Sequence, residues 1–184
     1  MALAPPSLPS QLALPTLTTP RLFLRPMALS DAPDIFAYAK DPEVLRHTTG
    51  TTPRRLEETQ EFLEGAVAAP DGRMWAIRLR DQATVIGAVE FSLLSSETGS
   101  VHYVLGKPYW GQGLMTEAVD AVCSWAFGTL PSLLEIKTAA VEENVGSARV
   151  LEKCGFTRIG TTVEQWQKQP EPVRLAIFRR HRGP

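Results

Sequence analysis

The sequence predicts a single α/β domain, in which a mixed sheet of about seven strands carries helices on both faces. Three observations favour this class. The chain has 184 residues and a hydrophobic fraction of 43%, which suits one folded domain with a substantial core. Short segments with period-two alternation are interspersed with segments of helical periodicity. The two kinds of segment alternate with each other only in the second half, so we expect largely antiparallel pairing in the first half.

Seven segments have the pattern of strands. The first alternates charged and apolar side chains, as a strand with one solvated face does. Short turns at residues 80–82 and 95–99 separate the next three segments, so these should pair as antiparallel neighbours. The expected strands cover residues 21–25, 74–79, 84–94, 101–105, 133–141, 156–167 and 173–180.

Four segments have the pattern of helices. Ser30 and Asp31 can cap the first of them. Thr52 as the cap and Pro53 in the first turn predict the start of the second. Gly155 predicts a left-handed end to the fourth. The expected helices cover residues 31–40, 53–68, 114–127 and 146–154.

A glycine loop connects the expected strand at 101–105 to the expected helix at 114–127. Gly111 and Gly113 let the backbone curl so that several N–H groups converge, with the positive end of the helix dipole behind them. The pair alone does not distinguish an anion site from a simple turn. The loop lacks the lysine of a P-loop and the third glycine of a dinucleotide fingerprint. Coenzyme A, whose diphosphate needs neither metal nor lysine, fits this loop best.

Composition excludes several other classes. A net charge of −1 argues against nucleic acid or an anionic membrane as a partner. The sequence contains no stretch of roughly 18 unbroken apolar residues, the length that a membrane span needs. Cys123 and Cys154 form no metal-ligand pattern with the three histidines, so we expect buried free thiols, no metal and a reducing cytoplasm.

The start of the chain has a composition of its own. Residues 1–18 are uncharged and rich in proline, and no basic region precedes their apolar stretches as it would in a signal peptide. We expect a flexible leader there, followed by one domain over residues 19–182.

Three segments occur in a fixed order between about residue 19 and residue 180. They are Thr19-Pro20-Arg21-Leu22-Phe23-Leu24-Arg25-Pro26, then Pro108-Tyr109-Trp110-Gly111-Gln112-Gly113 with Thr116-Glu117-Ala118, and Asn144 to Phe156. Together they resemble the GCN-five-related N-acetyltransferases (GNAT), and among these the RimJ/RimL type that acetylates the N-termini of ribosomal proteins. The resemblance implies the GNAT fold, with a splayed, mostly antiparallel sheet, and acetyl-CoA as the cosubstrate.

The resemblance also implies a set of cofactor contacts. The diphosphate would bind backbone N–H groups of the glycine loop, the strand before the loop would pair with the pantetheine amides, and Asn144 would bond the same chain. In this sequence the family's small residue is replaced by Met115, and its basic or glutamine side chain by Trp110. The expected contacts are Tyr103, Val104, Leu105, Trp110, Gly111, Gln112, Gly113, Leu114, Met115, Thr116, Asn144, Ser147 and Arg149.

Acetyl transfer requires an acid for the departing thiolate, a polarised carbonyl and a neutral amine. The resemblance places the Ser147 hydroxyl near the sulfur, where it would be the acid, although Asn144 and Ser147 also suit a helix cap. A strand N–H near Val104 or Leu105 would polarise the carbonyl. Glu90 and His102 are alternative bases. Relatives often carry a glutamate where this chain has Ser100, so the motif does not assign the base.

The acceptor is left open by the sequence. We expect its cleft between the loop at residues 46–49 and the final hairpin near Trp166. The leading interpretation is direct attack, in a ternary complex, by a primary amine such as the N-terminal α-amine of a ribosomal or other protein. About a tenth of an α-amine is neutral at pH 7, against under about a thousandth of a lysine. The alternatives are a small amine (polyamine, amino acid or aminoglycoside) and a non-catalytic acyl-CoA-binding module, and a homodimer stays open.

Overall fold

A computed structural model describes residues 14–68 and 72–183. It contains one sheet of eight strands in the order β1-β2-β3-β4-β5-β6-β8-β7. The strands are β1 (Leu17–Thr18), β2 (Leu22–Pro26), β3 (Gly72–Leu79), β4 (Gly87–Leu93), β5 (Thr98–Leu105), β6 (Glu135–Val141), β7 (Thr157–Glu164) and β8 (Val173–His181). The helices are α1 (Ala32–Ala39), α2 (Pro42–Leu45), α3 (Leu56–Ala68), α4 (Leu114–Thr129) and α5 (Val145–Lys153), with 3₁₀ turns η1 (Leu29–Asp31) and η2 (Lys107–Tyr109).

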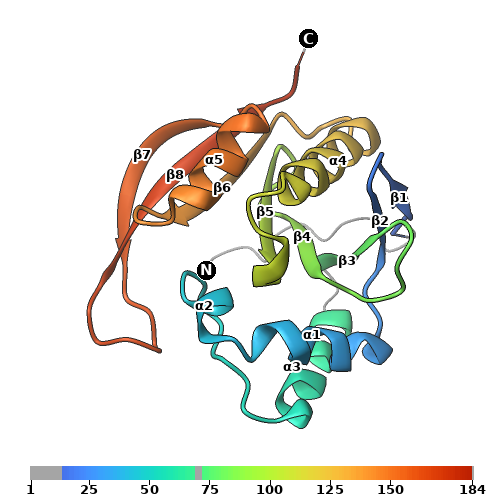
Figure 1. The fold of residues 1–184 in the computed structure, drawn as a ribbon. Helices are drawn as coiled ribbons and strands as arrows, with labels where there is room; N and C mark the ends of the chain where they lie inside the picture. Colours follow the sequence, from blue (N-terminus) through green and yellow to red (C-terminus); the bar gives the residue numbers. More distant parts are fainter. Residues whose placement is uncertain (1–13, 69–71, 184) are drawn as a thin grey trace.

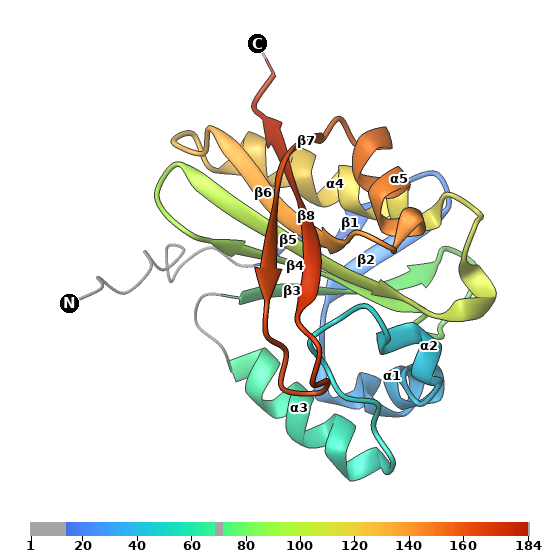
Figure 2. The same ribbon diagram turned by 90° about the vertical axis from the view of Figure 1, so that its left-hand side faces the viewer.

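Helices cover both faces of the sheet, which confirms the predicted class (Figure 1, Figure 2). Successive side chains of β3 and β4 point to opposite faces of the sheet, with large side chains on one face and alanines on the other. Trp75 and Phe91 belong to the larger core, which α4 and α5 cover. Ala76 and Ala88 belong to the smaller core, which α1 and α3 cover. The small alanines allow these two helices to lie close to the sheet.

The sheet divides between β5 and β6. These two strands pair in parallel over only three residue pairs, from Thr98 opposite Glu135 to Ser100 opposite Lys137. Every other pairing in the sheet is antiparallel. Beyond Ser100 the two strands diverge, and Figure 1 shows β6 and β8 turning away from β5. The splayed, mostly antiparallel sheet that the resemblance implied is therefore present.

Apart from the 3₁₀ turns, two elements were not predicted, and the first alters the domain boundary. Leu17–Thr18 forms the edge strand β1 against β2. The indole N–H of Trp75 also donates to the carbonyl of Pro15, at 2.9 Å. The packed domain thus includes residues that the sequence assigned to the leader, while residues 1–13 of that leader lie outside the described residues. The other unpredicted element is the four-residue helix α2.

The boundaries of several elements differ from the prediction. Helix α3 begins at Leu56, so the expected start at Thr52 and Pro53 is wrong. The carboxylate of Glu58 accepts the backbone N–H of Arg54 at 2.9 Å and satisfies a donor just before the helix. Strand β4 begins at Gly87 instead of residue 84, and strand β7 ends at Glu164 instead of residue 167. The left-handed end of α5 at Gly155 is confirmed by its φ of +77°.

Candidate active site

The glycine loop adopts the curled conformation that the sequence predicted. Gly111 and Gly113 have φ angles of +74° and +75°. A residue with a side chain would cost about 1–2 kcal/mol in this left-handed region. Gly113 is the N-cap of α4, and no side chain in the described chain caps the first turn of this helix. Its N–H groups therefore point off the end of the helix, where the dipole favours an anion.

The loop borders open space at Gly111. A Cβ added at Gly111 would meet no described atom within 4 Å. The side chain of Met115 is buried in the larger core, so this unusual residue does not crowd the loop. Thr116 lies in the same turn, and its carbonyl accepts the Cys154 thiol at 3.3 Å.

An ion-pair clamp holds the loop to the start of β2. The Arg21 guanidinium bonds the Glu117 carboxylate at 2.7 Å and the carbonyl of Gln112 at 2.8 Å. Glu117 also accepts the backbone N–H of Arg21 and the Thr19 hydroxyl. Burial opposes ionisation of Glu117, but the hydrogen bonds from Thr19 and Arg21 outweigh it and lower its pKa. Thr19, Arg21 and Glu117 belong to the motifs that carry the family resemblance, but their sequence pattern did not reveal this clamp.

The loop is also connected to the end of β5. The indole N–H of Trp110 donates to the carbonyl of Leu105 at 2.7 Å. The Gln112 amide donates to the carbonyl of Pro108 at 3.0 Å. Trp110 therefore fixes the loop relative to the strand, a contact that its place in the sequence did not reveal.

Within the described residues, β5 has no strand partner on the β6 side beyond Ser100. The N–H of Gly106 donates to the carbonyl of Ile86, on the β4 side. Backbone groups two residues apart in a strand point to the same side, so those of Val104 also point to β4. The backbone N–H and C=O groups of Tyr103 and Leu105 point the other way, into the gap beside β6. Of the two candidates for polarising the carbonyl, only the N–H of Leu105 faces this gap, so Val104 is not suited to that role or to pantetheine pairing.

The start of α5 brings three expected residues together. The side chain of Asn144 caps the helix by accepting the N–H of Ser147 at 3.1 Å. The Tyr103 hydroxyl lies 2.7 Å from the Ser147 hydroxyl and 3.3 Å from the Ser147 carbonyl. Burial raises the pKa of Tyr103 above its ordinary value. Arg149 is exposed farther along α5.

The two candidate bases lie on the other face of the sheet. Glu90 and His102 are directly opposite each other on β4 and β5. Val104, two residues beyond His102, packs against the core under α1 and α3, so all three side chains share that face. His102 is exposed and pairs with the Ser100 hydroxyl at 2.9 Å, whereas Glu90 is half-buried. The candidate acid and bases thus flank the gap from opposite faces.

The two segments expected to frame the acceptor cleft are in contact. Lys168, in the β7–β8 loop, donates to the carbonyls of Leu45 and Gly50 at 2.6 and 3.2 Å. Figure 2 shows this loop extending beside the segment between α2 and α3. Burial lowers the pKa of Lys168, and burial with the nearby Arg46 lowers the pKa of His47. Lys168 therefore links the two segments, which together are called the acceptor wall below.

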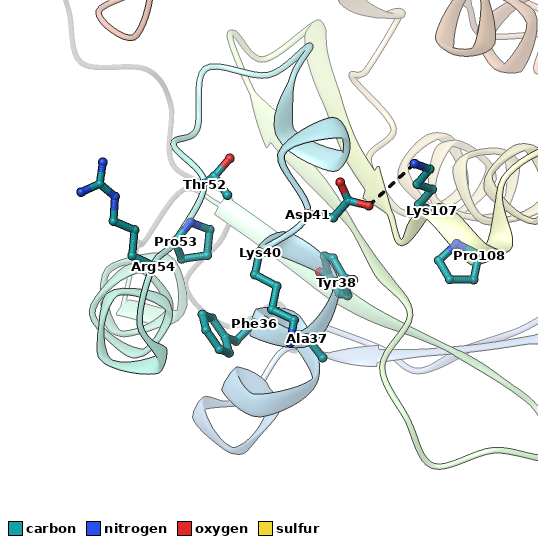
Figure 3. A pocket seen from close by; sticks show the side chains of 10 residues that line it. All are labelled: Phe36, Ala37, Tyr38, Lys40, Asp41, Thr52, Pro53, Arg54, Lys107 and Pro108. Atoms are coloured by element: carbon teal, nitrogen blue, oxygen red, sulfur yellow. Dashed lines mark ion pairs between the residues drawn. The ribbon is translucent and has the colours of Figure 1, made fainter.

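A separate open groove of about 800 Å³ lies between α1 and η2 (Figure 3). An ion pair between Lys107 and Asp41 crosses one end at 4.0 Å. None of the expected site residues lines this groove. Its lining residues are Phe36, Ala37, Tyr38, Lys40, Asp41, Thr52, Pro53, Arg54, Lys107 and Pro108.

The two cysteines lie in the larger core. Cys123 and Cys154 are buried free thiols, as expected, and burial raises the pKa of each to about 12. Among the described residues, no group of three histidine, cysteine or acidic side chains could hold a metal ion. Within residues 14–68 and 72–183, no helix has the length and apolar character to cross a membrane.

Comparison with known proteins identifies the family. The model of the acetyltransferase (GNAT) domain matches residues 21–157. The uncharacterized N-acetyltransferase p20 of Bacillus licheniformis is 29% identical over 150 residues, which cover 79% of this chain and 84% of that protein.

Solved acetyltransferases share the fold at low sequence identity. A GNAT-family acetyltransferase from Bacillus anthracis has a TM-score of 0.81 at 21% identity, covering 90% of this chain and 98% of that one. The ribosomal L7/L12 α-N-protein acetyltransferase RimL, solved with coenzyme A, has a TM-score of 0.75 at 17% identity, with coverages of 91% and 98%. Spermidine N-acetyltransferase from Vibrio cholerae, solved with CoA and spermine, has a TM-score of 0.74 at 17% identity, with coverages of 87% and 95%. The chain belongs to the GNAT family and is an N-acetyltransferase of that type.

Proposed function

We propose that this protein is an acetyltransferase of the RimJ/RimL type, which moves the acetyl group of acetyl-CoA to the N-terminal α-amine of a protein. The observation that carries the cofactor assignment is the open first turn of α4, preceded by two left-handed glycines. Several N–H donors converge there with a helix dipole behind them, and no metal or lysine is needed to hold a diphosphate.

The residues around this turn would bind the cofactor in two parts. Backbone N–H groups from Gly111 to Met115 would bind the diphosphate. The backbone groups of Tyr103 and the N–H of Leu105, which face the gap between β5 and β6, would pair with the pantetheine amides. The CoA complexes of RimL and of spermidine N-acetyltransferase support this class of cosubstrate.

The proton donor and the proton acceptor of the reaction would lie on opposite faces of the sheet, on either side of the gap. Acetyl-CoA supplies the acyl group as a thioester, whose C–S bond breaks as the amine nitrogen bonds to the acyl carbon. Ser147 gives a proton to the departing sulfur from the α5 face. Glu90 or His102 accepts the proton of the amine from the opposite face, directly or through water. The N–H of Leu105 polarises the carbonyl. This arrangement favours direct attack in a ternary complex.

The fraction of neutral amine at pH 7 favours a peptide α-amine over a polyamine. The acceptor wall itself carries charges of both signs, with Arg46 and Lys168 against Glu171, and it does not select between the two acceptors. An α-amine has at most one charge and is neutral in about a tenth of molecules at pH 7. The small amine nevertheless belongs in the test, because a spermidine acetyltransferase shares the fold.

The test is CoA release from acetyl-CoA across a matched panel of amines. The panel pairs each peptide with its N-terminally blocked form and includes spermidine, free amino acids and an aminoglycoside. We expect turnover with free N-termini only, and a loss of about 10²-fold or more in kcat for Ser147→Ala with acetyl-CoA affinity nearly unchanged. Turnover with spermidine alone would show that the acceptor is a polyamine and not a protein N-terminus. Binding of acetyl-CoA with no turnover on any amine would identify a binding module.

A further inference from the structure

The hydroxyl of Tyr103 is a polar group to which the proposed chemistry gives no task. Its ring packs against the larger core, while its hydroxyl contacts the Ser147 hydroxyl and carbonyl at 2.7 and 3.3 Å. Burial raises the pKa of the phenol, so it stays protonated at neutral pH and carries one proton to donate. Only its backbone was expected to contact the cofactor.

We propose that Tyr103 is a positioning residue that aims the proton of Ser147 at the sulfur; this inference rests on the proposed function. A serine hydroxyl can rotate, and it can donate in only one direction at a time. When Tyr103 donates to the Ser147 oxygen, the serine keeps its own proton for a second partner. In the opposite arrangement, Ser147 donates to Tyr103 and has no proton for the thiolate.

The first arrangement places the Tyr103 proton on the shorter of its two contacts with Ser147. The Tyr103 hydroxyl lies 2.7 Å from the Ser147 hydroxyl, where either oxygen can be the donor, and 3.3 Å from the Ser147 carbonyl, to which it can also donate. Asn144 holds the backbone N–H of the same residue at 3.1 Å, so the first turn of α5 is fixed from a second side. As the proton moves from serine oxygen to sulfur, the bond from Tyr103 stabilises the charge that develops on that oxygen. The amine gives one proton to the base and the sulfur receives one from Ser147. Water then returns a proton to the Ser147 oxygen and the base releases its own to solvent, so the transfer balances.

The test is the Tyr103→Phe variant alone and in the Ser147→Ala background. We expect Tyr103→Phe to lower kcat about tenfold, with the KM for acetyl-CoA within about twofold of wild type. In the Ser147→Ala background the same substitution should change kcat by less than about twofold, because the residue through which it acts is gone. Stabilisation by acetyl-CoA in a thermal melt shows that each variant is folded and binds the cofactor.

Tyr38→Phe is the matched control. Tyr38 is partly buried on the opposite face, and burial raises its pKa as well, yet it lies in the core under α1 and α3. The inference is wrong if Tyr103→Phe leaves kcat unchanged, or if it slows both backgrounds by the same factor. An inactive wild-type protein would instead refute the proposed function, so the two failures are distinguishable.

Discussion

Helices α4 and α5 lie on the same face of the sheet and begin in opposite ways. The N-cap of α4 is Gly113, a left-handed residue without a side chain, and its first turn has no side-chain cap in the described structure. The N-cap of α5 is Asn144, whose side chain accepts the N–H of Ser147. One helix start keeps its donors for an external anion, while the other satisfies a donor internally.

The difference explains how one face of the sheet supports two tasks. At α4 the backbone itself is the binding group, so the local requirement is for glycine and for a rigid support, which Arg21 and Glu117 provide. At α5 the functional group is a side chain, and the cap fixes the turn that carries Ser147. Binding and chemistry should therefore respond to different substitutions.

The largest expected effect is on binding at α4. Replacing Gly111 and Gly113 together with alanine should weaken acetyl-CoA binding by about 100-fold, because each left-handed position costs about 1–2 kcal/mol for a residue with a side chain. Calorimetric titration measures the affinity. Gly128→Ala in the same helix is the control, since its φ is not positive and a Cβ there meets no described atom within 4 Å. Equal affinities for the two variants would show that the left-handed turn does not form the site.

An intermediate effect is expected on stability at α5. Asn144→Ala should lower the free energy of unfolding by about 1 kcal/mol, because the N–H of Ser147 loses its acceptor. Asn144→Asp keeps the acceptor oxygen and should retain most of that stability. Urea unfolding of the two variants separates the cap from any amide contact with the cofactor. The cap has no such role if both variants unfold at the wild-type midpoint.

The smallest effect is a pH dependence of the clamp behind α4. The folded-state pKa of Glu117 is lowered, so its ion pair adds stability above the unfolded pKa of about 4.3 and loses it as pH falls through the folded pKa. Glu117→Gln should remove about 1 kcal/mol or less at pH 7 and flatten the loss of stability below about pH 4.5. Thermal melts from pH 7 to pH 3 measure this. Glu61→Gln, at an exposed residue of α3, is the control and should keep the wild-type profile.

Local signals predicted part of this molecule. Gly111 and Gly113 were identified because a turn into a helix at that spacing requires residues that tolerate positive φ. The two-residue strand β1 was missed because alternation cannot be recognised over two positions. Thr52 and Pro53 resemble a helix start, yet α3 begins at Leu56. The side chain that accepts a backbone N–H just before the helix is Glu58, which accepts that of Arg54.

Contacts between distant segments were outside the reach of sequence patterns. The choice between Val104 and Leu105 depends on which neighbour each backbone group faces, and this is set by pairing with β4. The contact between Tyr103 and Ser147 joins residues 44 positions apart, and the fold alone brings them together.

The most direct test of the account is a crystal structure of the protein with acetyl-CoA. We predict that the diphosphate lies within hydrogen-bonding distance of the N–H groups from Gly111 to Met115, with the thioester between β5 and β6. A diphosphate seated elsewhere, for example beside Lys40, Arg54 and Lys107 in the open groove, would contradict the central claim.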